Sequence, residues 1–381
     1  MRSSLFCSLL AVATAGTGSA GAREAVALLG TYTDSGSRGI YAVRVDGERG
    51  VLSEPTLVAE LADPEFLALH PNGRFVYALT HNTTEAGKKV GAVAAFEVEP
   101  LTGKLTFLNT AATDCGTFCH LAVDATGRML VAASYGGGHV ASFTLQADGR
   151  VGDVRGVITH EGTRGPRRDR QEAPHPHSVT LSPDNRFAYV ADLGLDRVFV
   201  YRIDLDTATL VPATPAYVTT AAGAGPRHAA FSTDGGALHV LNELNNTLAT
   251  WRYDEANGAL ELLETSSTLP EGFEGQNTTS EVRVHPKGRF VYAANRGHDS
   301  VAVFARKSDT PLLERVETVP CGGVSPRNFA LTPDGRWLLC AHQRSASLAL
   351  FRVDADSGRL ELQPALAKVP RVVCVLFLPQ D

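Results

Sequence analysis

Residues Val282–Arg296 read VRVHPKGRFVYAANR, and this stretch decides the fold. Apolar and polar residues alternate on both sides of a Pro-Lys-Gly-Arg turn, which is the pattern of two β-strands joined in a hairpin. Five other stretches repeat the pattern: Leu67–His81 (LALHPNGRFVYALTH), Leu121–Tyr135, Val179–Leu193, Ala229–Glu243 and Phe329–Gln343. A chain with regular copies of one hairpin is expected to be a repeat architecture.

The repeat has the length of a propeller blade. Its turn residues follow one another at intervals of 47 to 58 residues: Asn72, Thr126, Asp184, Asp234, Lys287 and Asp334. A third and a fourth strand follow in most copies, for example Val301–Lys307 and Leu312–Val319. Four antiparallel strands in about 50 residues are typical of a β-propeller blade. No long segment shows a 3.6-residue period, which excludes a helical solenoid.

The two chain ends hold the parts of a seventh unit. Val26–Asp46 matches the second and third strands of a blade, and Val372–Leu378 matches a first strand. One blade built from both ends would close the ring and remove its open sheet edges. The sequence therefore predicts an all-β protein: a seven-bladed β-propeller with four antiparallel strands per blade, closed by N- and C-terminal strands in one blade. Because a closed ring has no free edge, we expect a monomer.

Composition and the N-terminus narrow the class of protein. The chain has 381 residues, is 44% hydrophobic and carries a net charge of −6, which argues against disorder and against general binding of nucleic acid. Arg2, the apolar stretch 5–16 and Ala20-Gly21-Ala22 resemble a signal peptide. We expect residues 1–22 to be removed and 23–381 to form one propeller domain, exported to the periplasm or secreted. No later apolar run is long enough to span a membrane.

The cysteines predict neither a metal site nor a rigid disulfide framework. Five remain after residue 22, an odd number: Cys115, Cys119, Cys321, Cys340 and Cys374. Cys115 and Cys119 are spaced for a small disulfide, and Cys340 and Cys374 lie in apolar strand-like runs and are expected to be buried. No second Cys/His pair completes a zinc site, so we expect no metal and no cofactor.

Counting from each turn residue locates a candidate site at the opposite face of the ring, near the central channel. Seven positions before the turn the six copies carry Glu65, Cys119, His177, Arg227, Ser280 and Arg327. Six positions before it they carry Phe66, His120, Ser178, His228, Glu281 and Asn328. Eight positions after it they carry Thr80, Ser134, Asp192, Asn242, Asn295 and His342, and nine positions after it His81, Tyr135, Leu193, Glu243, Arg296 and Gln343. A solvated channel would explain the small polar residues, whereas converging Arg, His and Glu favour a site for an anionic ligand.

Several strings occur in an order that resembles a known family. They are Gly30-Thr31-Tyr32, Gly39-Ile40-Tyr41, Arg170-Gln171, His175-Pro176-His177-Ser178, Gly225-Pro226-Arg227-His228, Asn242-Glu243, Ser280-Glu281, Asn295-Arg296-Gly297 and Ser325-Pro326-Arg327-Asn328-Phe329. Together they resemble the seven-bladed lactonase family, which includes propeller-type 6-phosphogluconolactonases and fungal carboxymuconate-lactonising enzymes. The resemblance covers roughly residues 26–378. It departs at Ser134-Tyr135 and Thr80-His81, and in the signal peptide, since phosphorylated sugar lactones are usually cytosolic.

The resemblance implies a catalytic set of His177, Arg227, Glu243 and Arg296. We expect a lactone hydrolase, 6-phosphogluconolactonase-like, acting on a sugar lactone or a related anionic lactone. Glu243 or His177 would be the general base, while Arg227 and Arg296 would hold the substrate anion or stabilise the oxyanion. The expected substrate-binding residues are His228, Glu281, Asn295, Arg327, Asn328, Tyr135 and His120.

Two alternatives remain open at the level of sequence. The same residues could catalyse the reverse chemistry, lactonisation or cycloisomerisation of an unsaturated dicarboxylate. A propeller could also bind ligands or partners without catalysis, because a fold alone proves no activity. The His/Glu pair beside the arginines favours an enzyme, since a binding platform has no need of proton-transfer groups there.

Overall fold

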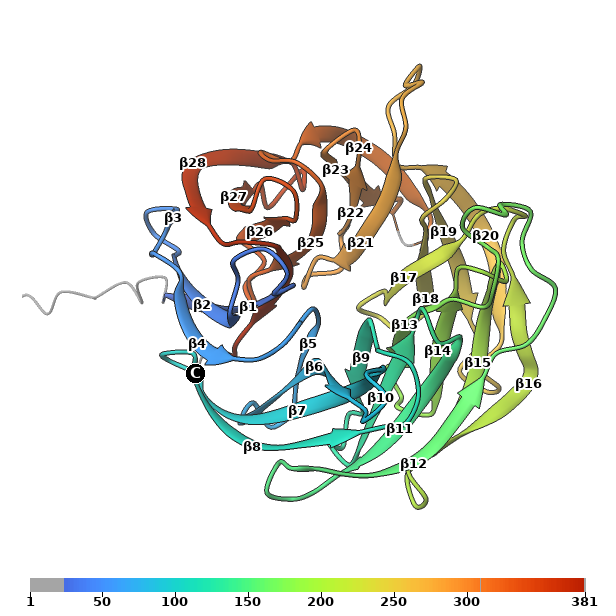
Figure 1. Cartoon of the computed structure of the whole chain (residues 1–381). Helices are drawn as coiled ribbons and strands as arrows, with labels where there is room; N and C mark the ends of the chain where they lie inside the picture. The colour runs from blue at the N-terminus through green and yellow to red at the C-terminus, as the bar shows by residue number, and fades with distance from the viewer. Residues whose placement is uncertain (1–23, 309, 380–381) are drawn as a thin grey trace, which may run out of the picture.

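The computed structural model describes residues 24–308 and 310–379, which contain 29 β-strands and no helix. The strands form seven sheets arranged as a ring (Figure 1). The seven-bladed propeller is therefore confirmed. The predicted signal peptide, residues 1–22, lies outside the described residues. No helix able to cross a membrane exists in the described part of the chain.

Six sheets are blades of four consecutive antiparallel strands. Blade 1 consists of β5 (Leu67–Leu69), β6 (Phe75–Thr83), β7 (Lys89–Glu99) and β8 (Lys104–Ala112). Blade 2 consists of β9 (His120–Val123), β10 (Met129–Ser134), β11 (His139–Leu145) and β12 (Val151–Thr159). Blade 3 consists of β13 (Pro176–Leu181), β14 (Phe187–Asp192), β15 (Arg197–Asp204) and β16 (Thr209–Thr219).

The next three blades repeat this order. Blade 4 consists of β17 (Pro226–Phe231), β18 (Ala237–Asn242), β19 (Thr247–Tyr253) and β20 (Leu260–Ser267). Blade 5 consists of β21 (Thr278–Val284), β22 (Phe290–Arg296), β23 (Ser300–Arg306) and β24 (Leu313–Pro320). Blade 6 consists of β25 (Pro326–Leu331), β26 (Trp337–His342), β27 (Ser347–Val353) and β28 (Leu360–Lys368).

Blade 7 joins the two ends of the chain, as predicted. It consists of β29 (Val372–Phe377), β1 (Ala25–Thr31), β2 (Gly39–Asp46) and the short strands β3 (Val51–Leu52) and β4 (Thr56–Glu60), which both pair with β2. The C-terminal β29 runs antiparallel to β1, with Leu29 opposite Val375. In Figure 1 the blue N-terminal strands accordingly lie beside the red C-terminal blade.

The hairpin turn between the first two strands depends on one position with positive φ. Glycine fills it in five of blades 1 to 6, with φ between 71° and 75°. Blade 3 has Asn185 there, with φ of 59°, and asparagine is one of the few other residues that tolerates this conformation. The repeated turn sets the register of each hairpin, so residues at equal distances from it occupy equivalent places in successive blades.

The first strand of each blade lies nearest the axis. These seven strands contact one another in order around the ring, from β5 through β9, β13, β17, β21 and β25 to β29 and back to β5. The apolar core lies between neighbouring blades, as where Tyr292 of blade 5 packs in one cluster with Phe351 of blade 6. Fourth strands such as β12 alternate between exposed and less exposed residues at the rim. Rigid inner strands therefore hold the residues that surround the channel.

Candidate active site

A cavity of about 340 Å³ lies at the channel mouth predicted from the sequence, and every blade contributes to it. Its polar and aromatic lining comprises Tyr32 of blade 7, Glu65 of blade 1, Cys119 and Tyr135 of blade 2, His177 of blade 3, Glu243 of blade 4, Arg296 of blade 5, Arg327 of blade 6 and Arg170 from the connection between blades 2 and 3. Most of these side chains stand where a first strand begins or a second strand ends. The repeat thereby gathers residues far apart in sequence around one cavity.

Three guanidinium groups surround the carboxylate of Glu243. Arg170 Nη2 lies 2.7 Å from Oε1, while Arg227 Nε and Arg296 Nη2 lie 2.9 and 3.1 Å from Oε2. His177 Nε2 lies 4.0 Å from the same Oε2. The Glu243 side chain is only 4% exposed. Its carboxylate therefore holds the arginines in place from within the cluster.

Burial alone would raise the pKa of Glu243, but the charges of Arg296, Arg227, His177 and Arg170 lower it well below the ordinary value of 4.5. For His177, burial and then the charge of Arg227 lower the pKa well below the ordinary 6.5. At neutral pH Glu243 is thus an ion and His177 a neutral imidazole, and neither carries a proton to give away. They differ in access: three guanidinium groups occupy the oxygens of Glu243, whereas the ion-pair partner of His177 is 4.0 Å from its Nε2, which leaves the imidazole the freer proton acceptor.

Cys119 lies beside His177 but does not form a catalytic thiolate with it. Its Sγ is 3.9 Å from His177 Nδ1 and 3.4 Å from the His177 carbonyl oxygen. Burial, and then the charge of Glu65, raise the pKa of this thiol to about 12, so it stays protonated. The possible disulfide between Cys115 and Cys119 is absent, because Cys119 contacts blade 3 while Cys115 bonds to Asp114. Cys340 and Cys374 are buried, as expected.

The cavity narrows toward the axis, where more of the predicted residues lie. Arg227, His228 and Asn328 line this narrow floor together with His177. Below it, Glu281 contacts His228 at 3.2 Å and accepts a hydrogen bond from the Asn328 amide. The predicted substrate-binding residues therefore lie at different depths in the channel. Tyr135 and Arg327 line the main cavity, whereas His228 and Asn328 line its floor and Glu281 lies behind them.

His120 also lies in the buried layer below the floor. Its ring centroid is 5.2 Å from that of His228 and 4.1 Å from that of Phe66. Its Nδ1 accepts a hydrogen bond from the Val179 backbone N–H, which ties blade 2 to blade 3. These contacts make His120 part of the packing that supports the floor.

Asn295 does not lie in the cavity, in contrast to the expectation. Its side chain is fully buried and bonds to Ser300 of its own blade and to Thr268 and Asn277 of the connection between blades 4 and 5. Successive residues of a strand point to opposite sides, so Arg296 reaches the cavity and Asn295 cannot. The same holds in blade 4, where Asn242 bonds to Thr247 while Glu243 reaches the site.

Among the tyrosines and charged residues of the cavity, sequence analysis left Tyr32, Glu65 and Arg170 without an assigned role. Glu65 could have been assigned from the sequence, because it lies seven positions before its turn residue, as do His177, Arg227 and Arg327. Tyr32 follows β1 in blade 7, whose inner hairpin is made from both chain ends and contains no turn to count from. Arg170 belongs to a long connection outside the repeat.

A basic groove continues outward from the cavity, with which it shares Arg170, Arg296 and Arg327. It measures about 910 Å³ and is also lined by Arg167, Arg344 and Arg371, against two acidic residues, Asp169 and Asp299. In the cavity itself four arginines face two carboxyl groups. The mouth is therefore positive although the whole chain is acidic.

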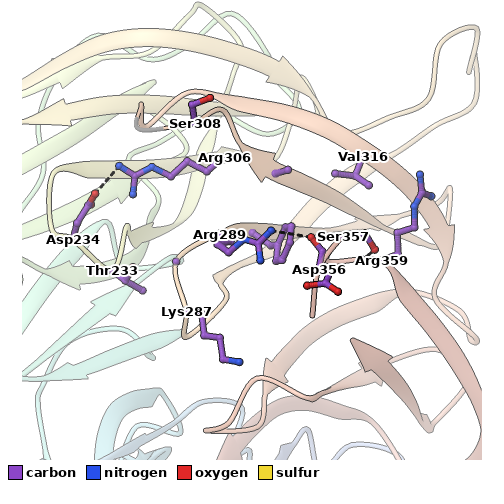
Figure 2. A pocket seen from close by; sticks show the side chains of 13 residues that line it. Thr233, Asp234, Lys287, Arg289, Arg306, Ser308, Val316, Asp356, Ser357 and Arg359 are labelled. Carbon is purple, nitrogen blue, oxygen red and sulfur yellow. Dashed lines mark hydrogen bonds and ion pairs between the residues drawn. The ribbon is translucent and has the colours of Figure 1, made fainter. Parts of the chain in front are cut away.

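A second large cavity lies at the face that carries the hairpin turns (Figure 2). It measures about 780 Å³ and lies between the turns of blades 4, 5 and 6. Figure 2 shows two of its arginines directed at partners: Arg306 pairs with Asp234 at 2.6 Å, and Arg289 donates to the Asp356 carbonyl. Its lining includes no histidine. The mouth, with its neutral imidazole, is the better candidate for chemistry.

No cluster of three or more potential metal ligands occurs within residues 24–308 and 310–379.

Comparison with known proteins gives matches along nearly the whole chain. Residues 26–377 match the family described as "Lactonase, 7-bladed beta-propeller". A 6-phosphogluconolactonase of Bacillus subtilis is 35% identical over 355 residues, covering 93% of this chain and 99% of the relative. One of Formosa agariphila is 29% identical, covering 84% and 88%. The solved structure of a Pseudomonas aeruginosa periplasmic gluconolactonase is 32% identical with a TM-score of 0.87, covering 94% of this chain and 99% of its own.

Proposed function

This chain belongs to the seven-bladed β-propeller lactonase family, and from that premise we propose that it is an enzyme that hydrolyses an anionic sugar lactone at the channel mouth. A 6-phosphogluconolactone-like substrate is the first choice. One observation carries the proposal: a neutral imidazole, His177, faces a cavity that three arginines, Arg170, Arg296 and Arg327, also line. The arginines supply attraction for an anion, and the imidazole supplies a proton acceptor.

His177 is assigned the role of general base. It takes a proton from a water molecule as the water oxygen bonds to the ring carbonyl carbon of the lactone. The carbonyl oxygen then carries negative charge, and Arg296 lies at the cavity surface to stabilise it, with Arg227 deeper in the floor. Of the two bases that the sequence allowed, Glu243 is the less suitable, because its oxygens are taken up by arginines. Glu243 instead positions Arg170, Arg227 and Arg296.

The basic groove supports an additional anionic group on the substrate. Arg327 and Arg344 form none of the ion pairs found in the described part of the chain. A phosphoryl group attached to the sugar could therefore bind there without first breaking a pair. The relatives named above differ in this respect, since two are called 6-phosphogluconolactonases and one a gluconolactonase.

The test is a panel of lactone hydrolysis assays with purified protein. We expect 6-phosphogluconolactone to give a higher kcat/KM than gluconolactone, and His177→Ala to lose on the order of 100-fold in kcat. His298→Ala is the matched control, because His298 lies outside the cavity lining and its side chain hydrogen-bonds to Ser300 of its own blade. Equal rates for wild type and His177→Ala would overturn the assignment of the base.

Two further outcomes separate this proposal from its alternatives. Turnover of an unsaturated dicarboxylate to a lactone, without hydrolysis of any lactone, would favour the reverse chemistry. Binding of sugar phosphates with no turnover in either direction would indicate a binding propeller.

Export also belongs to this proposal. It is supported by the signal-like N-terminal sequence and by the likeness to a protein called periplasmic. N-terminal sequencing of material from the periplasm or medium should find a chain that begins near Arg23. A protein that keeps Met1 would contradict export.

A further inference from the structure

The cavity contains a second carboxyl group that the mechanism above does not use. Glu65 precedes β5 in blade 1 and lines both the cavity and its narrow floor. Its Oε2 accepts a hydrogen bond of 2.5 Å from the Tyr32 hydroxyl, which in turn accepts one of 2.9 Å from Arg327 Nη2. Glu65 takes part in no ion pair found among residues 24–308 and 310–379.

The two glutamates of the cavity have opposite surroundings. Glu243 is buried beneath three guanidinium groups, whereas the side chain that hydrogen-bonds to Glu65 is the neutral Tyr32. When two carboxyl groups of one site differ in this way, the one held by cations remains an ion, and the other can carry a proton. The geometry thus leaves Glu65 free for proton transfer.

The charged and titratable groups around Glu65 come from several blades: Tyr32 of blade 7, Arg327 of blade 6, Arg227 of blade 4, Cys119 of blade 2 and Asp63 of its own segment. Burial raises the pKa of Glu65, and Asp63 acts in the same direction. The hydrogen bond from Tyr32 and the charges of Arg327 and Arg227 oppose this, but the net shift is upward. Glu65 therefore keeps its proton to higher pH than an ordinary glutamate.

We propose that Glu65 is the general acid that protonates the leaving oxygen of the lactone ring, a role that rests on the lactonase function proposed above. As the tetrahedral intermediate collapses, the carbonyl π bond re-forms and the bond from the carbonyl carbon to the ring oxygen breaks. The Glu65 proton passes to that oxygen, which becomes the hydroxyl of the product. The proton that His177 took from water then returns to the Glu65 carboxylate, directly or through water, and the net reaction consumes one water.

The experiment compares leaving groups in wild type and Glu65→Gln. An aliphatic sugar lactone expels an alkoxide and needs an acid, whereas a phenolic lactone such as dihydrocoumarin expels a stable phenolate and does not. We expect Glu65→Gln to lose on the order of 100-fold in kcat on the aliphatic lactone and to keep its rate on the phenolic one. The alkaline limb of the wild-type kcat profile, where Glu65 deprotonates, should be present for the aliphatic lactone and missing in the variant.

A control variant and a second measurement separate the role of Glu65 from the proposed lactonase function. Glu54→Gln changes an exposed glutamate outside the cavity and should match wild type on both lactones. Equal losses on both lactones, or no loss on either, would overturn the role of Glu65 while leaving the lactonase function intact. A wild-type protein that hydrolyses no lactone would instead overturn the proposed function, and with it this role. If Glu65→Gln fails to fold, an alkaline limb of equal size for both lactones in wild type would overturn the proposal.

Discussion

Glu243 has a positioning role in the proposed active site, where His177 rather than Glu243 is assigned the proton transfer. It is an anion buried beneath Arg170, Arg227 and Arg296. Without it three cations would face one another in a cavity with little solvent, which is costly. The resemblance to the lactonase family marked Glu243 as a candidate base. Its partners, which only the fold reveals, make it the residue that holds the arginines in position.

Glu243→Gln should therefore weaken the fold as well as the activity. We expect a loss of about 3 kcal/mol in the free energy of unfolding at pH 7, because removing one member of a buried charge cluster leaves the others unpaired. Glu243 has a lowered pKa in the folded state, so its stabilisation is complete above the unfolded value near 4.5 and is lost as pH falls below it. Urea titrations from pH 7 to pH 3 should show a constant difference from wild type at first, and a shrinking one below about pH 4.5.

Glu97→Gln, at an exposed ion pair in blade 1, is the matched control for that series. Its free energy of unfolding should stay within about 1 kcal/mol of wild type. A Glu243→Gln protein as stable as wild type at pH 7 would contradict the view that the carboxylate holds the cluster together.

Tyr32 tunes Glu65 through the hydrogen bond to its carboxyl group. Tyr32→Phe removes a donor that favours the charged form, so the pKa of Glu65 should rise further. The alkaline limb of the kcat profile should then move to higher pH by roughly one unit, the size expected for a hydrogen bond to a charged group. Tyr41→Phe, at a tyrosine of β2 outside the cavity lining, is the control and should leave the profile unchanged. An unchanged or lowered limb in Tyr32→Phe would contradict the link between the two residues.

At the scale of the element, the repeated hairpin explains which site residues could be predicted from the sequence and which could not. Equal spacing from the turn correctly brought His177, Arg227 and Arg327 to one mouth, because the turn sets the register of every blade. Counting alone could not show which of Asn295 and Arg296 lines the cavity, since both are polar. Adjacent residues of a strand point to opposite sides, and only the structure shows which side faces the cavity. Nor could it assign Tyr32 or Arg170, which lie outside the repeated hairpin. For such residues, the contacts between strands and connections determine whether the side chain lines the cavity.

The hairpin turns also join neighbouring blades, and glycine makes this contact possible. Gly335 has a φ of 73°, and a Cβ there would lie 2.5 Å from Nε2 of His285 in blade 5. The same ring atom contacts the Gly335 carbonyl at 3.0 Å. We expect Gly335→Ala to lower the free energy of unfolding by about 2 kcal/mol, from backbone strain and displacement of the ring.

Gly236→Ala tests the explanation for Gly335, since a Cβ at Gly236 meets only Asp234 Oδ1, at 3.7 Å. That variant should be as stable as wild type or slightly more so. Urea midpoints measured side by side would decide, and equal midpoints for the two variants would contradict the role of the close turn contact.

At the scale of the whole molecule, the ring places a positive mouth on an acidic protein. The chain carries a net charge of −6, yet the cavity and its groove gather Arg167, Arg170, Arg296, Arg327, Arg344 and Arg371. Such local charge arises because separate segments of the chain converge at one end of a channel. Among the segments that supply these arginines, only residues 164–170, with four arginines and one aspartate, are basic as a stretch of sequence.

The positive mouth should make catalysis depend on salt. Clefts of one charge raise the encounter rate with ligands of opposite charge, and added ions screen that attraction over about 10 Å at 0.1 M ionic strength. We therefore expect kcat/KM for 6-phosphogluconolactone to fall on the order of tenfold between low salt and about 0.5 M NaCl, while kcat changes little. Uncharged gluconolactone provides the control within the same protein, and its kcat/KM should stay nearly constant. Parallel salt dependence for both lactones would show that the arginines of the groove do not attract the substrate. A difference that disappears in Arg344→Gln would assign part of the attraction to an arginine that lies in the groove and outside the catalytic cavity.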